Sequence, residues 1–303
     1  MVKKLNQVQL AEKAKKSSQP LTVDIQGKKT AYWRYPTNNS DDSQRAIVFI
    51  HGYRGNHHGL EAIAGAIETS DVYIPDLPGF GKSEAFDGEH SVKNYANWLN
   101  DFITSLNLKH KPHLLGHSFG SIVVSAYASR YQGIHTLILE NPVASPALKG
   151  PKAFITAIAR GFFWFAAKLP EITGDRLLQS WPMVRGMSIL MTKSRVAELR
   201  KWVHRQHDEN FNDYASRRVA LEGYAASISS CVSDYAAGFT IPALMLIGDK
   251  DDITSVAQQK RLCSQLPVAG SELKEFKGVG HLTHYEIPEK IGNAISVWVE
   301  THA

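Results

Sequence analysis

A serine lies between two glycines in the segment Gly116-His117-Ser118-Phe119-Gly120, after a short apolar run and before a stretch of small residues. Glycines at these positions allow a sharp, strained turn from a strand into a helix, which presents the serine hydroxyl at the positive end of that helix. A hydroxyl presented in this way can attack a carbonyl carbon, so Ser118 is the candidate nucleophile. An ordinary glycine-rich turn is the alternative that these five residues leave open.

A nucleophilic serine needs a base that accepts its proton and an acid that orients the base. An acidic cluster at 249–252 and then His281 follow Ser118, so the order along the chain is serine, acid, histidine. His284 is the main rival for the base, although a packing or hydrogen-bonding role fits it better. His117 lies beside the serine, but its position on the turn directs its side chain elsewhere.

Alternating strands and helices must bring these groups together. Short apolar runs are typical of strands buried on both faces of a parallel sheet, and the amphipathic stretch Ser91–Leu106 predicts a helix. The repeated alternation predicts a mostly parallel sheet between two helical layers, a three-layer α/β/α sandwich in which reactive groups collect where strands end. The expected strands are an antiparallel hairpin at Leu21–Gln26 and Thr30–Tyr35, then Arg45–Ile50, Val72–Pro75, the run ending at Leu115, Thr136–Leu139, Ala243–Ile247 and Leu273–Phe276.

The pattern divides the chain into three parts. Residues 1–20 are polar and lysine-rich and form an N-terminal extension. The α/β core covers 21–144 and 237–303, with a polar loop at Asn38–Gln44. Residues 145–236 contain no convincing strand and predict an inserted helical cap, or lid, over the serine. Two helices are expected at its end, Arg195–Gln206 and Asn212–Ser230.

Five segments, in this order and at these spacings, resemble the α/β-hydrolase superfamily, in particular its serine carboxylesterases and lipases with a helical cap. The resemblance extends over roughly residues 21–303 and implies the sandwich fold. It also implies that Ser118 is the nucleophile and His281 the base. The matching segments are His51-Gly52, Asp76 to Ser83, Gly116 to Gly120, Gly248 to Asp251 and Gly280 to Pro288.

The acid is Asp251 by the superfamily pattern, which places it three residues after the glycine that ends the strand. Asp249 and Asp252 replace it if the loop shifts by one or two residues. Glu140, at the end of the strand after the elbow helix, is a further alternative because some relatives carry the acid there. A structural role fits Glu140 better.

The oxyanion that forms during attack needs two backbone N–H donors. The resemblance implies the N–H of Phe119, directly after the nucleophile, and the N–H of Tyr53, directly after His51-Gly52. The resemblance also places Asp76 in a loop that supports the site. The alternative is that Asp76 caps a turn. The serine at position 118, where an aspartate would be needed, argues against dehalogenase and epoxide-hydrolase chemistry.

These features predict a serine hydrolase that cleaves a carboxylic ester of a small or medium acyl substrate through an acyl-enzyme on Ser118. The alternatives are an acyltransferase or a carbon–carbon bond hydrolase that uses the same three residues, and a non-catalytic ligand-binding protein with this fold. The implied partner is a small-molecule ester or other acyl compound, and no cofactor or metal is expected. The sequence leaves the oligomeric state open.

Composition narrows the partners and the location. The net charge of +5 is spread along the chain in short runs, which argues against nucleic-acid binding. Cys231 and Cys263 have no metal-type spacing and fit a reduced, cytoplasmic protein, with one disulfide as the alternative. His57 and His58 fit loop residues better than metal ligands, because no carboxylate or cysteine spacing accompanies them.

No run of apolar residues is long enough to cross a bilayer. The nearest, Ala153–Leu169, is interrupted by Arg160 and Lys168. The aromatic residues and methionines of the predicted cap either line an acyl pocket or pack the cap onto the core, and both roles can hold at once. A third interpretation is that Phe162–Phe165 makes weak contact with a membrane surface.

Overall fold

An eight-stranded sheet forms the centre of the protein. The computed structural model describes residues 6–37, 45–146 and 153–302, so the loop expected at 38–44 lies outside the described residues. The strands are β1 (Gln19–Ile25), β2 (Lys28–Tyr35), β3 (Ile47–Ile50), β4 (Val72–Pro75), β5 (His113–His117), β6 (Leu137–Glu140), β7 (Ala243–Gly248) and β8 (Glu272–Phe276). Their spatial order is β1-β2-β4-β3-β5-β6-β7-β8, with parallel pairing from β4 to β8 and antiparallel pairing of β2 with both of its neighbours.

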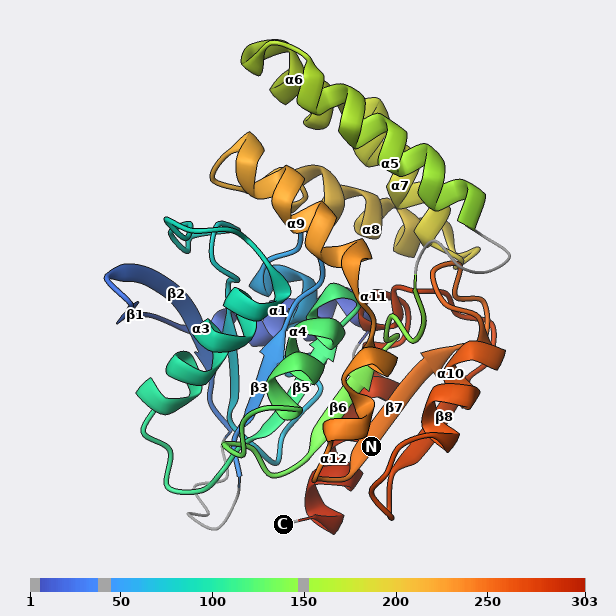
Figure 1. Cartoon of the computed structure of the whole chain (residues 1–303). Helices are drawn as coiled ribbons and strands as arrows, with labels where there is room; N and C mark the ends of the chain where they lie inside the picture. The colour runs from blue at the N-terminus through green and yellow to red at the C-terminus, as the bar shows by residue number, and fades with distance from the viewer. Residues whose placement is uncertain (1–5, 38–44, 147–152, 303) are drawn as a thin grey trace.

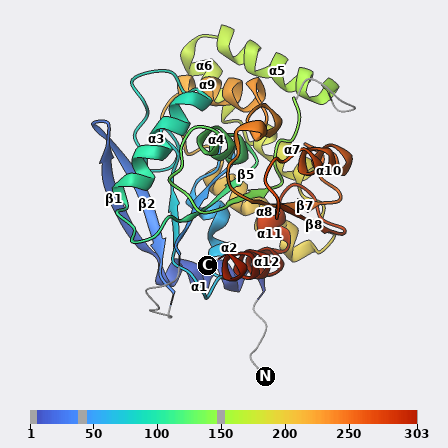
Figure 2. The same ribbon diagram turned by 60° about the horizontal axis from the view of Figure 1, so that its bottom comes forward.

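Helices cover both faces of this sheet. Figure 2 shows α3 and α4 on one face and α2 and α12 on the other, which confirms the mostly parallel three-layer sandwich expected from the sequence. The helices are α1 (Gln7–Ser17), η1 (His57–Leu60), α2 (Glu61–Ala64), α3 (Val92–Ser105), α4 (Phe119–Ala128), α5 (Ala153–Lys168), α6 (Glu171–Leu178), α7 (Trp181–Met191), α8 (Ala197–Asn210), α9 (Arg217–Ser229), η2 (Val232–Asp234), η3 (Ala236–Gly238), α10 (Val256–Ser264), α11 (Thr283–Glu286) and α12 (Pro288–Thr301).

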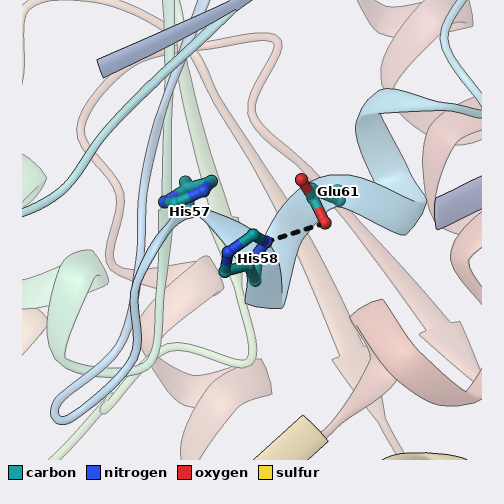
Figure 3. Close-up of side chains that lie close together, drawn as sticks. All are labelled: His57, His58 and Glu61. Carbon is teal, nitrogen blue, oxygen red and sulfur yellow. Dashed lines mark hydrogen bonds and ion pairs between the residues drawn. The ribbon is translucent and has the colours of Figure 1, made fainter. Parts of the chain in front are cut away.

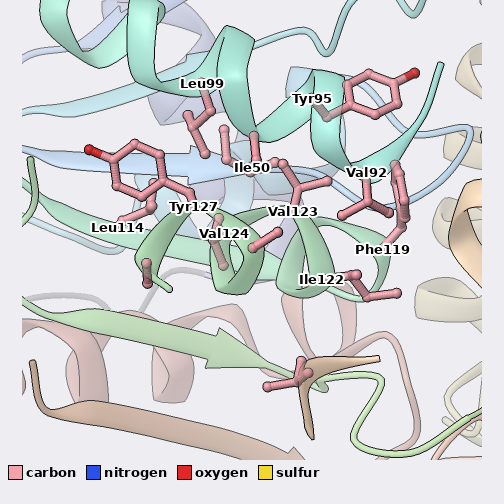
Figure 4. Close-up of a cluster of buried hydrophobic side chains, with 14 of the residues drawn as sticks. Ile50, Val92, Tyr95, Leu99, Leu114, Phe119, Ile122, Val123, Val124 and Tyr127 are labelled. Carbon is pink, nitrogen blue, oxygen red and sulfur yellow. The ribbon is translucent and has the colours of Figure 1, made fainter. Parts of the chain in front are cut away.

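The apolar runs of the sequence become strands that are buried along their whole length. Every residue of β3, β5, β6 and β7 is buried, because helices cover both of their faces. In Figure 4 the apolar side chains of α3 and α4, among them Leu99 and Val123, lie between these helices and the sheet, where Ile50 of β3 joins the same cluster. This packing fixes the strand ends from which the loops of the site emerge.

The first two strands form the expected hairpin. Gln26 and Gly27 connect them, and both have positive φ angles, of 57° and 76°. This pair of positive angles is typical of the two-residue turn that matches the twist of antiparallel strands. The hairpin lies at one edge of the sheet and pairs with β4 through β2.

Five helices, α5 to α9, lie beyond the carboxyl ends of the parallel strands (Figure 1). They belong to the part of the chain between β6 and β7, where the described residues form no strand and one isolated bridge joins Tyr214 to Phe80. α8 and α9 overlap the two helices expected from the sequence, and α5, α6 and α7 are additional.

Helix α4 packs directly on β3 and β5 because two glycines carry no side chain. A Cβ atom at Gly120 would lie 2.3 Å from the carbonyl oxygen of Ile50, and one at Gly116 would lie 2.4 Å from the carbonyl oxygen of Gly120. No side chain fits at such distances without a shift of the backbone. The two glycines around Ser118 are therefore required by packing.

Gly120→Ala is expected to lower the free energy of unfolding by about 2–3 kcal/mol, because α4 must move away from β3. Gly161→Ala is the matched control, since Gly161 is exposed in α5 and an added Cβ meets nothing within 4 Å. The control should raise the free energy of unfolding by up to about 1 kcal/mol. Urea denaturation followed by circular dichroism measures both, and equal effects would contradict the packing argument.

Candidate functional site

Ser118 occupies a strained turn between β5 and α4. Its backbone angles are φ 52° and ψ −118°, a region that costs a non-glycine residue about 1–3 kcal/mol. The N–H of Ser118 donates to the carbonyl oxygen of Glu140 at 3.2 Å, which holds the turn against the end of β6. The serine hydroxyl thus lies at the N-terminus of α4, as the glycine pattern predicts.

The structure brings Ser118, His281 and Asp251 together from three different loops. Nε2 of His281 lies 2.8 Å from Oγ of Ser118, and Nδ1 of His281 lies 3.0 Å from Oδ2 of Asp251. The other carboxylate oxygen of Asp251 accepts hydrogen bonds from the N–H groups of Ile253 and Thr254, at 2.7 and 3.3 Å. Asp251 is therefore held by its own loop with one oxygen turned toward the histidine.

The alternative acids have other partners. Oδ1 of Asp249 accepts from the N–H of Gly278 at 2.6 Å, and Asp252 forms an ion pair with Lys193. Glu140 lies near His117 and His284. The geometry thus favours Asp251 among the four acids considered.

His284 lies on α11, close to the other two histidines of the site. Its Nδ1 is 3.4 Å from Oε1 of Glu140, and its ring centre is 4.2 Å from that of His117. The ring of His117 is in turn 5.1 Å from the ring of His281. His281 is the histidine within hydrogen-bond distance of Ser118.

The two residues expected to donate N–H groups to an oxyanion flank the serine. Phe119 is the first residue of α4, where backbone N–H groups have no partner within the helix. Gly52, just before Tyr53, approaches the turn so closely that an added Cβ would lie 3.3 Å from Cβ of Ser118. The Tyr53 hydroxyl donates to the carbonyl oxygen of Ala220 at 2.6 Å, so its side chain is tied to α9.

Asp76 organises the loop after β4. Its Oδ1 accepts from the N–H of His57 at 2.8 Å, and its Oδ2 accepts from the N–H of Lys82 at 2.9 Å. Nε2 of His51 accepts from the N–H of Leu77 at 2.9 Å, which ties the same loop to the loop after β3. Asp76 thus binds backbone N–H groups in the turns of both loops, which is the turn-capping role expected as its alternative.

Asn141 is a site residue that the sequence did not reveal. It is fully buried with φ 41°, directly after β6. Its Oδ1 accepts from the N–H of Gly248 at 2.9 Å, while its Nδ2 donates to the carbonyl oxygen of His281 at 2.7 Å and to the hydroxyl of Thr283 at 3.0 Å. One side chain therefore sets the end of β7, which leads to Asp251, relative to the loop of His281.

Glu286 joins the same loop to the helices above it. Its Oε1 accepts from the N–H groups of Lys193 and Ser194 at 2.6 and 2.9 Å, and its Oε2 accepts from the N–H of Gly280 at 3.2 Å. The connection between α7 and α8 is thus fixed to the residue just before His281.

Arg54 makes a second link, from the loop after β3. It is 1% exposed and has a φ of 60°. Its Nε donates to the carbonyl oxygen of Phe211 at 2.9 Å, and its Nη2 donates to that of Leu178 at 3.1 Å. The loop that carries Tyr53 is therefore bound to α6 and to the end of α8.

A cavity of about 560 Å³ opens at Ser118, beneath α5, α7, α8 and α9. Gly52, Tyr53 and His281 line it together with Ser118. Most of its wall is apolar, and Gln206, His207 and Asn210 are among its polar side chains. The apolar lining from the helices includes Ile158, Phe162, Phe163, Met183, Met187, Leu190, Met191 and Ile228.

The four aromatic residues Phe162–Phe165 of α5 divide between the cavity and the solvent. Phe162 and Phe163 line the cavity, and the ring of Phe163 stacks on Tyr224 with 3.8 Å between centres. Trp164 and Phe165 are 63% and 53% exposed. Pocket lining and packing therefore both hold for the first pair, and membrane contact by the second pair stays a prediction. No described helix has the length and apolar character needed to span a membrane.

Two groups of histidine and acidic side chains in the described part of the chain are close enough to hold a metal ion. Figure 3 shows the first, His57, His58 and Glu61. Hydrogen bonds already engage it, because Nδ1 of His57 lies 2.9 Å from Asp76 and Nδ1 of His58 lies 3.1 Å from Glu61. The second group is His117, Glu140 and His284. Both cysteines of the chain are free thiols outside these groups.

The fold and the serine–histidine–acid geometry define an α/β-hydrolase. The family model described as serine aminopeptidase, S33, matches residues 41–288, and the chain belongs to this family. The superfamily expected from the sequence motifs is therefore confirmed.

Several of the relatives are lipases. The chain is 25% identical to a monoacylglycerol lipase of Mycolicibacterium smegmatis, over 86% of this chain and 90% of that protein. It is also 25% identical to a monoglyceride lipase of Rattus norvegicus, over 88% of this chain and 85% of that protein. With the family match, these relatives identify the class of enzyme as a carboxylesterase-type hydrolase.

Solved structures agree in fold. A thermophilic esterase from Thermogutta terrifontis superimposes with a TM-score of 0.74 at 20% identity, over 94% of this chain and 100% of that one. An esterase from Exiguobacterium antarcticum superimposes with a TM-score of 0.75 at 19% identity, over 93% of this chain and 100% of that one.

Asn141→Asp is expected to lower the free energy of unfolding by about 1–3 kcal/mol at neutral pH, because a carboxylate would face the carbonyl oxygen of His281. Asn107→Asp is the matched control, since Asn107 is exposed and also has a positive φ, of 46°. Denaturant unfolding measures both variants. A loss of stability no larger than that of the control would show that the Asn141 amide does not fix these loops.

Proposed function

We propose that the protein is a serine hydrolase that cleaves a carboxylic ester with an apolar acyl chain through an acyl-enzyme on Ser118. The observation that carries this proposal is the hydrogen-bonded series Ser118–His281–Asp251 at one end of a mainly apolar cavity. Nucleophile, base and acid in this order match the chemistry of acyl transfer.

In the first step, Oγ of Ser118 attacks the ester carbonyl carbon and Nε2 of His281 takes the hydroxyl proton. The carbonyl π electrons move to oxygen and give a tetrahedral oxyanion. Asp251, next to Nδ1, stabilises the imidazolium that forms and keeps the ring in the orientation that the reaction needs. His281 then returns the proton to the leaving alcohol as the ester C–O bond breaks.

The N–H groups of Tyr53 and Phe119 hold the oxyanion. Removal of one preorganised donor to such an oxyanion costs roughly 2.7–4 kcal/mol elsewhere. The N-terminus of α4 adds a favourable dipole at the same place. Because both donors are backbone groups, the side chains of these residues remain free to pack against neighbouring helices.

Water completes the cycle. His281 takes a proton from water, the resulting hydroxide attacks the acyl carbon, and Ser118 leaves with the proton that His281 returns. An acyltransferase would use another alcohol or amine here, and a carbon–carbon bond hydrolase would expel a carbanion instead of an alkoxide. The names of the relatives favour water and an ester, and the complete set of three residues disfavours a purely ligand-binding role.

The cavity supports an acyl chain of medium length or longer as substrate. We assign residues 145–236, insofar as they are described, to a cap whose helices cover the serine and provide Phe162, Met187 and other apolar contacts. Thioether and aromatic side chains adapt to flexible chains. Two relatives are named as hydrolases of monoacylglycerol, so an ester with a single acyl chain is the substrate class proposed for this protein.

Ser118→Ala is expected to reduce the hydrolysis of p-nitrophenyl esters by about 10⁴-fold or more and to abolish labelling by a fluorophosphonate. His281→Ala should reduce both nearly as far. Ser105→Ala, at an exposed helical serine, is the control and should retain full labelling. Unlabelled wild type without ester turnover would refute the proposal, and labelling without turnover would indicate another acyl acceptor or substrate. Labelling that persists in His281→Ala but is lost in His284→Ala would reassign the base.

Acyl length should control the rate. We expect kcat/KM to rise with each added methylene by up to about fourfold, since a buried methylene contributes about 0.8 kcal/mol, until the cavity is filled. Phe162→Asp should reduce the preference for long over acetyl esters by at least about tenfold, because it places a charge at the cavity wall. Trp164→Asp, two residues further on the same helix but 63% exposed, is the matched control. Equal preferences in the two variants would remove α5 from the acyl site.

A further inference from the structure

Three buried side-chain atoms next to the site lack hydrogen-bond partners. They are Nδ1 of His117, Nδ1 of His284 and Oε2 of Glu140, and none has a partner among the residues that the structure describes. The three residues are at most 6% exposed. Buried polar atoms are nearly always paired, so three such atoms in one place indicate a missing partner.

We propose that His117, Glu140 and His284 bind one divalent transition-metal ion of the zinc type. Their ligand atoms all lie within 4.8 Å of one another. Two imidazole nitrogens and one carboxylate oxygen are a set that zinc prefers, with water in the fourth position. Magnesium and calcium prefer oxygen ligands throughout and fit this set poorly.

The spacing of the atoms supports a metal ion over direct hydrogen bonds. Nδ1 of His117 lies 3.4 Å from Oε2 of Glu140, and Nδ1 of His284 lies 3.4 Å from Oε1. Charge-assisted hydrogen bonds are usually shorter, about 2.7–2.9 Å. Ligands placed about 2.0–2.1 Å from a zinc ion in a tetrahedron are separated by about 3.3–3.4 Å. The pair His117 Nδ1 and Glu140 Oε2 has this separation, and the other separations in the group, which lie within 4.8 Å, need small side-chain shifts to reach it.

A neighbouring hydroxyl group orients the carboxylate of this group. The hydroxyl of Thr283 donates to Oε1 of Glu140, which orients the carboxylate and leaves Oε2 available. The group at His57, His58 and Glu61 lacks this availability because hydrogen bonds already engage it.

The cavity offers a route to this site, because His117 and His284 line it together with Ser118. The His117 ring is 5.1 Å from that of His281. A bound cation would oppose the positive charge that His281 carries while it holds the serine proton, so occupancy should slow the reaction. This consequence rests on the proposed function, whereas the binding itself does not.

The direct test uses the full chain without a histidine tag, freed of metal by a chelator and then titrated with Co²⁺ and Zn²⁺. We expect one Co²⁺ per chain with the intense visible absorption of tetrahedral cobalt, displaced by Zn²⁺, and no comparable binding of Mg²⁺. Zinc should raise the melting temperature of the wild type. Absence of this spectrum and of stoichiometric zinc binding in equilibrium dialysis would overturn the proposal, whatever the variants do.

Variants then locate the ion. Glu140→Gln and His284→Asn should each weaken binding by about 100-fold or more, since loss of a ligand exceeds the roughly 10–100-fold effect of outer-shell changes. His58→Asn, from the group of Figure 3, is the matched control and should bind as the wild type does. Circular dichroism of each metal-free variant reports whether it is folded. Unchanged affinity in a folded Glu140→Gln or His284→Asn chain would overturn the assignment.

His281→Ala separates this site from the proposed reacting residues. It should keep cobalt binding although it loses ester hydrolysis. Loss of binding in His281→Ala would place the ion on the reacting histidine and overturn the proposal. If the wild type binds one ion but shows no fluorophosphonate labelling or ester turnover, the proposed function fails and the metal site stands. If it turns over esters but binds no ion, the reverse holds.

Discussion

The contact between α4 and the strands beneath it is the constraint on which the site depends. The Cα of Gly120 lies against the carbonyl group of Ile50 with no room for a side chain, and Gly116 meets α4 in the same way. This close approach forces the chain to turn sharply at Ser118, whose backbone accepts a strained conformation as a result. The position of the Ser118 hydroxyl thus follows from the close backbone packing at Gly116 and Gly120, two residues before and after it.

Two buried polar side chains then align the remaining loops. Asn141 sets the end of β7 against the loop of His281, and Glu286 fixes that loop to the connection between α7 and α8. Each supplies hydrogen-bond partners to backbone groups of irregular loops that would otherwise have none. These loops can therefore lie buried at the carboxyl edge of the sheet. The distances around His281 follow from these bonds as much as from the strands.

Much of the fold and part of the site could be predicted from the sequence, because both depend on local patterns. The strands β3, β4, β5 and β7 are apolar runs, and Ser118 has glycines at a distinctive spacing. Helices α5, α6 and α7 were not expected, since interior glycines weaken their periodicity. Spacing alone left Asp249, Asp251 and Asp252 open, because the bonds that aim one carboxylate depend on the fold of the loop. Asn141 gave no signal, since its partner His281 is 140 residues away.

The carboxylate of Glu286 also has a mechanical consequence. It accepts N–H groups from the stretch between α7 and α8 and from Gly280 at the same time. Any hinge motion that lifted those two helices would therefore pull on the segment that carries His281 or break both sets of bonds. Helix α5 has no such tether to this segment among the described hydrogen bonds. Arg217 of α9 binds the carbonyl oxygens of Ala167 and Leu169 at the C-terminal end of α5 instead, so a displacement of α5 would strain α9 and leave the segment of His281 in place.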